Sequence, residues 1–105
     1  MQRYYVEIHC VTGPDDRLDN DVDVLMEALV EEPGLIDADV LAELATGQVT
    51  ISASVDGEDE AVALRDALTG IRSAAHKAGA RTPDWAAVIA ERTETSVRPA
   101  AAATC

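Results

Sequence analysis

An acid and a histidine two positions apart are the first residues in this chain that could do chemistry. Glu7 and His9 lie in an alternating segment, residues 3–10, whose other side is apolar: Tyr4, Val6, Ile8 and Cys10. Residues i and i+2 of a strand project from the same face, so the Glu7 carboxylate can orient the His9 imidazole, with Tyr5 beside them. We interpret His9 as a candidate general base that Glu7 or Tyr5 assists.

A second alternating segment offers hydroxyl groups to this pair. Thr50, Ser52 and Ser54 recur at every second position, and we expect Ser52 or Ser54 across from His9, where an imidazole could activate a hydroxyl. A glycine elbow, an oxyanion site at a helix N-terminus and a phosphate loop are all missing from the sequence. Such residues more often form a polar strand face, so catalysis is the alternative interpretation.

The sequence gives little support for a metal site. Asp19, Asp21 and Asp23 imitate the start of a calcium loop, but Val24 replaces the required glycine and Val30 the bidentate acid. Acids at a helix start explain the triplet without a metal. We expect no metal and no cofactor.

The remaining metal-ligating residues have ordinary explanations. His9 and Cys10 are adjacent in a strand and point to opposite faces, so they cannot chelate one ion. His76 lies near a predicted helix C-terminus, where the dipole favours a cation. A disulfide between Cys10 and Cys105 is not expected, because Cys105 ends an alanine-rich tail.

The segment 37–55 predicts a β-hairpin that turns at Thr46 and Gly47. That turn pairs apolar residues on one face: Leu44 with Val49, Ala42 with Ile51, Val40 with Ala53 and Ala38 with Val55. On the other face it pairs Glu43 with Thr50, Leu41 with Ser52 and Asp39 with Ser54. The first face is therefore expected to form the core and the second to contact water.

Two helices are expected around this hairpin. The first, entered through the acids near residue 20, has the apolar stripe Val22, Leu25, Met26, Leu29 and Val30. The second follows Glu58, Asp59 and Glu60 and has the stripe Ala61, Leu64, Leu68, Ile71, Ala75 and Ala78. Gly70 inside it should allow a neighbouring element to pack closely.

The last segment is ambiguous. Thr82, Pro83 and Asp84 look like a helix start, whereas residues 93–97 look like a strand that would cover the open edge of the first strand. We favour the strand. A single domain is then expected over residues 1–97, with a disordered tail over 98–105.

The order strand, helix, hairpin, helix, strand resembles the ferredoxin-like βαββαβ fold, an α+β architecture. The resemblance covers residues 3–97 and includes no functional motif. It implies a four-stranded antiparallel sheet in the order 4-1-3-2 with both helices on one face. Tyr5, Glu7 and His9 would then lie on a central strand of the open face. The composition also resembles that of small proteins of high-GC bacteria, which points to no named functional family.

The net charge of the chain limits the kinds of molecule that we expect it to bind. The net charge is -12, and residues 1–60 carry 16 acids against Arg3 and Arg17. Such a chain repels phosphate backbones and anionic membranes, and the open face has only one stacking aromatic, Tyr5, so no nucleic-acid or membrane partner is expected. The sequence has no run long enough for a membrane span and no signal-peptide plan, so we expect a cytoplasmic location.

These observations lead to a hypothesis of a non-catalytic module that associates with itself or with a basic protein partner. Its expected binding surface is the open face: Tyr5, Glu7, His9, Asp39, Leu41, Glu43, Thr50, Ser52 and Ser54. In a homodimer, Arg92 or Arg98 would offset the facing acids. A variant of this hypothesis is an acidic decoy that imitates nucleic acid. The alternative is a small cofactor-independent enzyme or small-ligand binder using His9 and Glu7.

Overall fold

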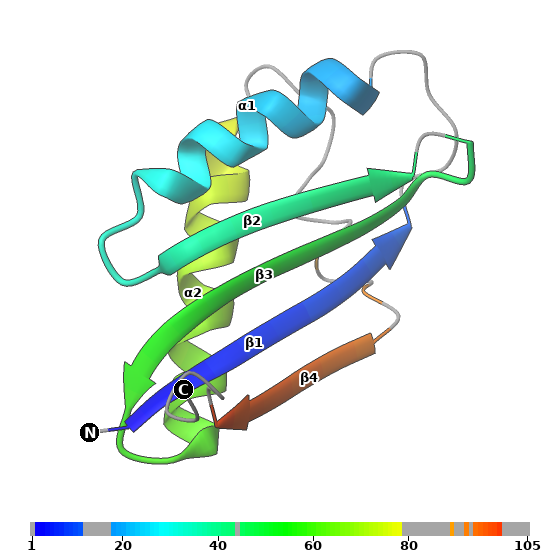
Figure 1. Cartoon of the computed structure of the whole chain (residues 1–105). Helices are drawn as coiled ribbons and strands as arrows, with labels where there is room; N and C mark the ends of the chain where they lie inside the picture. Colours follow the sequence, from blue (N-terminus) through cyan, green and yellow to red (C-terminus); the bar gives the residue numbers. More distant parts are fainter. Residues whose placement is uncertain are drawn as a thin grey trace.

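The computed structural model describes residues 2–11, 18–43, 45–78, 89, 92 and 94–99, which form one antiparallel sheet with two helices on one face (Figure 1). The elements in chain order are β1 (Gln2–Val11), α1 (Leu18–Val30), β2 (Ile36–Glu43), β3 (Gln48–Gly57), α2 (Glu60–Ala78) and β4 (Glu94–Pro99). The strand order β2-β3-β1-β4 is the predicted order 4-1-3-2. The ferredoxin-like fold is therefore confirmed.

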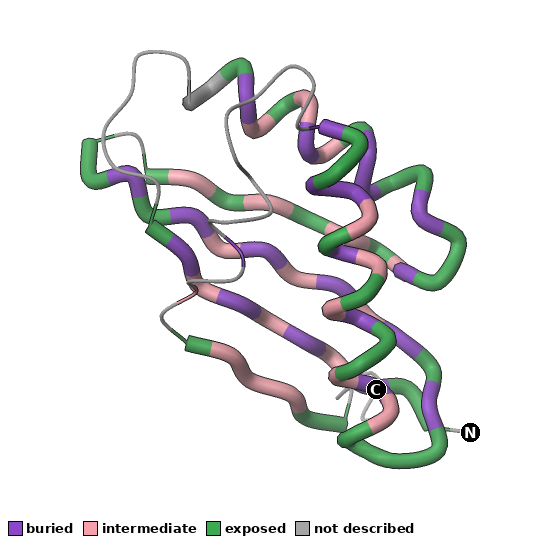
Figure 2. Tube along the Cα trace, turned by 180° about the vertical axis from the view of Figure 1, so that it is seen from behind, coloured by how far each residue is buried: buried purple, intermediate pink, exposed green. Residues whose placement is uncertain are grey.

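The core lies between the helices and the inward face of the two central strands. Along β1 and β3, buried positions alternate with half-buried ones (Figure 2). The inward residues of β1 are those that the sequence predicts: Tyr4, Val6, Ile8 and Cys10. Each large aliphatic side chain buried here stabilises the fold by about 1.5–3 kcal/mol. Because the fold needs an apolar residue at every second position, the strand can be recognised from the sequence.

The β2–β3 hairpin has the predicted faces but not the predicted register. The observed pairs are Leu41 with Thr50, Asp39 with Ser52 and Glu43 with Gln48, two residues away from the expected partners. Because side chains alternate with a period of two, this shift leaves every residue on its predicted face. Leu44 lies outside the described residues.

The turn explains the shift. The Glu43 carbonyl accepts hydrogen bonds from the N–H groups of Thr46, at 3.3 Å, and Gly47, at 2.9 Å. Gly47 has a φ of 74°, a left-handed conformation that glycine adopts at little cost. The last pair of the hairpin is Glu43 with Gln48, so the turn is centred one residue earlier than the sequence predicts, and this displacement shifts the pairing by two residues.

A β-bulge interrupts β2 near its start. Ile36 pairs with Ser54 and Asp39 with Ser52, so two residues of β2 lie opposite Ala53. One of the two is Asp37, whose φ is 50°. Aspartate is among the few residues with a side chain that tolerate this left-handed conformation.

Helix α1 packs through a stripe slightly different from the prediction. Leu25 and Leu29 are fully buried as expected, but Ala28 is buried too and Val30 is 65% exposed. At 3.6 residues per turn, Val30 stands about 140° from Leu25 around the helix, outside the stripe. The prediction that Val30 belongs to the core is wrong.

Helix α2 presents its alanines to the sheet. Its buried residues are Ala63, Ala67, Ile71, Ala74, Ala75 and Ala78. Leu64 and Leu68 are only half-buried at the edges of this face, and Ala61 is exposed, contrary to the prediction. Small side chains on the central stripe let the helix axis lie near the sheet, so the larger leucines fit only at its flanks.

Gly70 and Leu35 make the close contact that the sequence predicts at this glycine. A Cβ atom added at Gly70 would lie 3.0 Å from Leu35 Cδ2, closer than ordinary van der Waals contact. Leu35 precedes β2, so the glycine lets the segment that leaves α1 pack directly against α2. The N-terminus of α2 is capped by Asp59, whose Oδ1 accepts a hydrogen bond from the N–H of Val62 at 2.9 Å.

Strand β4 confirms the preference for a strand at the end of the chain. It begins at Glu94 and continues through Arg98 and Pro99, two residues beyond the predicted end of the domain. Residues 100–105, the rest of the expected tail, lie outside the described residues. Within the competing helix, the structure describes Ile89, which is helical and fully buried, and Arg92, which lies outside any helix or strand.

Neither helix of the described segments has the length and apolar character needed to cross a membrane. The cytoplasmic location stays a prediction.

Candidate active site on the open sheet face

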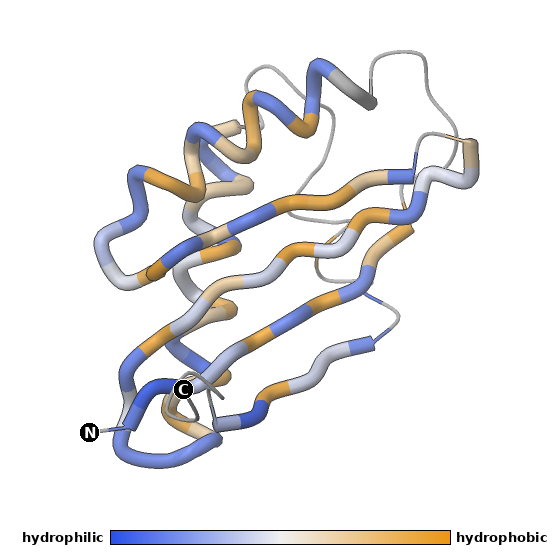
Figure 3. Tube along the Cα trace, in the orientation of Figure 1, coloured by the Kyte–Doolittle hydropathy of each residue, from blue (hydrophilic) through white to orange (hydrophobic). Residues whose placement is uncertain are grey.

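The face of the sheet opposite the helices carries aligned polar side chains from all four strands. Hydrophilic and hydrophobic positions alternate along the middle of β1 (Figure 3). Three cross-strand rows result: Glu94, His9, Thr50 and Leu41; Ser96, Glu7, Ser52 and Asp39; and Arg98, Tyr5, Ser54 and Ile36. Glu7 therefore lies on a central strand between Ser96 and Ser52, and His9 lies between Glu94 and Thr50.

Hydrogen bonds join three neighbours on β1. His9 Nε2 lies 2.8 Å from Glu7 Oε1. The Tyr5 hydroxyl donates to the other carboxylate oxygen, Oε2, at 3.0 Å. Both oxygens of Glu7 are therefore engaged, and the carboxylate is held between the phenol and the imidazole.

The hydroxyl next to His9 belongs to Thr50, not to Ser52 or Ser54 as the sequence predicts. Thr50 is the cross-strand partner of His9, and its Oγ1 lies 3.2 Å from His9 Nδ1. Ser52 and Ser54 stand opposite Glu7 and Tyr5. The β1–β3 register, which the sequence does not fix, decides this difference.

The hydrogen bonds of Glu7 and His9 determine which atoms of this network carry protons. The hydrogen bond from Tyr5 lowers the pKa of Glu7 from its ordinary value, with further help from His9 and Arg98, although burial opposes the shift. An ionised carboxylate only accepts hydrogen bonds, so His9 Nε2 carries the hydrogen that points to it. In the neutral imidazole, Nδ1 is then the basic nitrogen, and the Thr50 hydroxyl donates to it.

Arg98 extends the network at its other end. Its guanidinium lies 4.6 Å from the centre of the Tyr5 ring, a cation–π arrangement. Arg98 was expected to neutralise acids of a second copy; in this chain it lies over Tyr5. Arg92 was the other residue expected to neutralise those acids. It donates hydrogen bonds to Thr95 Oγ1 at 2.7 Å and to the Ile89 carbonyl at 3.2 Å.

The remaining residues of the expected binding surface lie at the edge of the sheet. Asp39, Leu41 and Glu43 are exposed on β2, and Leu41 is 71% exposed. They share the open face with the network. Leu41 comes nearest to it, as the cross-strand neighbour of Thr50.

A hollow of about 200 Å³ adjoins the His9 end of the network. Two members of the network line it, His9 and Thr50, and further lining comes from Gln48, Glu94 and the neighbouring strand positions. Sequence reasoning missed Gln48 and Glu94. The true hairpin register would have revealed the first, and the position of β4 beside β1 the second.

The thiol near this hollow is not a candidate nucleophile. Cys10 is a free cysteine whose side chain points into the core. Burial raises the pKa of its thiol to about 11, so the reactive thiolate is scarce at neutral pH.

Glu7→Gln should weaken the fold and flatten its response to acid. Because the pKa of Glu7 is lowered in the folded state, its contribution to stability is present above the ordinary value of 4.5 and is lost as the pH falls through the lowered value. At neutral pH we expect a loss of about 1 kcal/mol from two altered hydrogen bonds. Urea unfolding between about pH 3 and 7 measures both effects.

Glu43→Gln is the matched control, because Glu43 is an exposed carboxylate on the edge strand. It should leave stability at neutral pH within about 0.5 kcal/mol of the parent. An acid response in Glu7→Gln as steep as that of the parent chain would contradict the structural role given to Glu7.

Solved structures with this fold include a candidate antibiotic biosynthesis monooxygenase from Chloroflexus aurantiacus J-10-fl, with a TM-score of 0.60, 14% identity and coverage of 93% of this chain and 92% of that one. A candidate antibiotic biosynthesis monooxygenase from Nitrosomonas europaea has a TM-score of 0.58, 13% identity and coverage of 94% and 90%. At these identities the likeness shows the fold. No family model and no curated protein matches the sequence.

These neighbours correct the functional hypothesis. Both carry the names of enzymes, so the prediction of a non-catalytic association module, with its acidic-decoy variant, is wrong. The comparison favours the alternative, a small enzyme or small-ligand binder. The roles of His9 and Glu7 in it stay a prediction. Association of the chain with a second copy or with a basic protein stays a prediction.

Proposed function

We propose that this chain is a small enzyme of the monooxygenase type that acts on an acidic small molecule, such as a phenol, at the open sheet face. The observation that carries the proposal is the continuous hydrogen-bonded chain Thr50, His9, Glu7 and Tyr5 beside a hollow. The enzyme names of the two fold neighbours support the choice of reaction class.

Proton removal from the substrate is the step assigned to this network. Glu7 holds the imidazole in the tautomer with a basic Nδ1, and the Thr50 hydroxyl lies 3.2 Å from that nitrogen. A substrate hydroxyl can give its proton to Thr50 Oγ1 while Thr50 passes its own proton to Nδ1. The resulting imidazolium is stabilised by the Glu7 carboxylate 2.8 Å away.

Deprotonation makes such a substrate easier to oxidise. The reaction of a phenol with O₂ to give a quinone and water is balanced without an added reductant, because the substrate supplies all the electrons. The protein's contribution is to generate the phenolate and to hold it at the hollow. With about 200 Å³, this hollow is below the usual 300–1,000 Å³ of ligand sites, so it fits one small ring or the edge of a larger molecule.

An oxygen electrode tests the proposal. The purified chain is incubated with a panel of mono- and polycyclic phenols, and O₂ uptake is compared with quinone formation by absorbance and mass spectrometry. We expect uptake and quinone in a one-to-one ratio that saturates with substrate. A panel in which the chain consumes no O₂ above the buffer rate, and in which no phenol shifts the amides of His9 and Thr50 by NMR, would contradict the proposal.

A further inference from the structure

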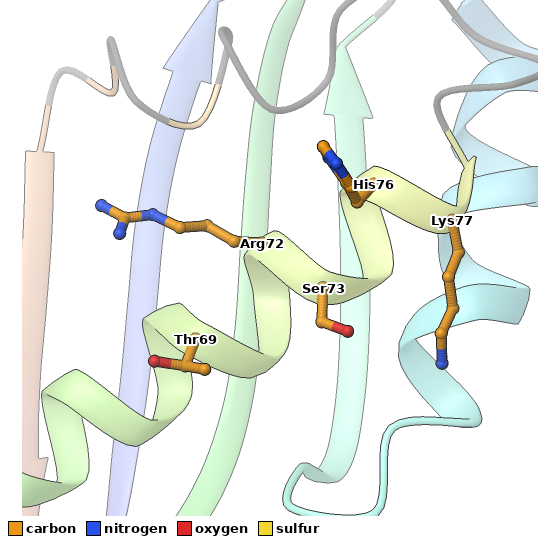
Figure 4. Close-up of a pocket in the computed structure, with 5 residues that line it drawn as sticks. All are labelled: Thr69, Arg72, Ser73, His76 and Lys77. Carbon is orange, nitrogen blue, oxygen red and sulfur yellow. The ribbon is translucent and has the colours of Figure 1, made fainter.

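The outward side of α2 carries a second and larger hollow. It has a volume of about 610 Å³, within the usual range of ligand sites. Its described lining is one helical stripe: Thr69, Arg72, Ser73, His76 and Lys77. Figure 4 shows the five side chains along α2, on the side of the helix away from the sheet. The sheet separates this hollow from the network around His9.

The stripe is cationic in a chain whose net charge is -12. Lys77 Nζ lies 3.2 Å from Glu32 Oε1, so its charge is partly offset. Arg72 differs, because no carboxylate or hydrogen-bond acceptor within the described residues engages its exposed guanidinium. The other arginines that the structure describes have partners in the chain: Arg3, Arg65, Arg92 and Arg98.

We propose that this hollow binds a small organic anion, with Arg72 as the residue that recognises its phosphate or carboxylate group. A guanidinium presents a planar pair of N–H donors that matches either group. Ser73 and His76 lie next to Arg72 on the stripe and can add donors, while Lys77 extends toward α1 on the other side (Figure 4). The proposal does not depend on the chemistry assigned to His9.

The binding test is an NMR titration of the full ¹⁵N-labelled chain. Inorganic phosphate and succinate are added in separate arms, each against sodium chloride at equal ionic strength, because salt alone screens charge. We expect saturable shifts at the amides of Arg72, Ser73 and His76, and none at His9 or Thr50. Saturation by phosphate alone assigns a phosphate ester, and saturation by both probes extends the site to carboxylates.

Arg72→Gln should weaken the affinity at least about tenfold, the effect expected when a charge-assisted hydrogen-bonding pair is lost. Arg72→Lys, which keeps the charge but loses the planar donors, should fall between this variant and the parent chain. Arg65→Gln is the matched control, since Arg65 is exposed two turns earlier on the same helix and pairs with Asp66 at 3.3 Å. It should bind like the parent.

Three results would overturn the proposal. The first is a set of shifts that do not saturate or that chloride reproduces. The second is an unchanged affinity in Arg72→Gln. The third is an equal loss in Arg72→Gln and Arg65→Gln, which would show that overall charge, not this hollow, governs binding.

Discussion

Replacing His9 by glutamine should reduce the O₂-dependent turnover of the best phenol by about 10²–10⁴-fold, the usual contribution of a general base. Glutamine can still hydrogen-bond to Glu7 and Thr50, so the network can persist while proton transfer is lost. Because the His9 side chain is 37% exposed, the substitution should change stability little. Steady-state O₂ uptake and urea unfolding of the same preparation measure the two effects separately.

Two controls sharpen this result. Arg3→Gln alters an exposed charge at the other end of β1, where Arg3 pairs with Asp56 at 3.0 Å, and should leave turnover unchanged. Thr50→Val removes the hydroxyl that relays the proton, whereas Thr50→Ser retains it. Full activity in the His9 variant would contradict the assignment of the base. A Thr50→Val variant as active as Thr50→Ser would contradict the relay and leave direct transfer to Nδ1.

Replacing Ile51 by alanine should lower the free energy of unfolding by about 2–5 kcal/mol. Ile51 is fully buried on β3, with Ile8 of β1 and Val40 of β2 as its cross-strand neighbours. Removing its outer carbons leaves a cavity that close-packed neighbours cannot fill. For a domain whose total stability is typically about 5–15 kcal/mol, this is a large fraction.

Leu41→Ala is the matched comparison, because Leu41 is also a large aliphatic residue of the hairpin but is 71% exposed. It should cost less than about 0.5 kcal/mol. Urea unfolding followed by circular dichroism measures both variants. Equal losses at Ile51 and Leu41 would contradict the burial pattern and would mean that the open face around Leu41 is covered in solution.

The faces of the strands could be predicted because they depend only on a period of two. Val40 and Ala42 keep to the core face although their partners differ from the prediction by two residues. The register itself depends on the hydrogen bonds that the Glu43 carbonyl accepts within the turn. Thr46 and Gly47 can occupy either the centre or the end of a turn, so the local sequence does not determine where the turn is centred.

Some residues of the candidate site could be predicted from the sequence and others could not. Tyr5, Glu7 and His9 lie on one strand, so alternation alone places them together. Thr50 joins them only through the β1–β3 register, and Glu94 only through the position of β4 beside β1. The angle at which α2 lies on the sheet is also a tertiary property, because its alanine-rich sequence offers several stripes of similar hydrophobicity.

The bulge at Asp37 has a consequence for how this protein behaves at high concentration. Strand β2 lies at the end of the sheet, the position from which strands of other molecules can be added to form aggregates. A left-handed residue and three exposed acids on β2, Asp37, Asp39 and Glu43, make that edge irregular and negatively charged. The protein can therefore expose Leu41 beside its open face without offering β2 as a template for fibril growth.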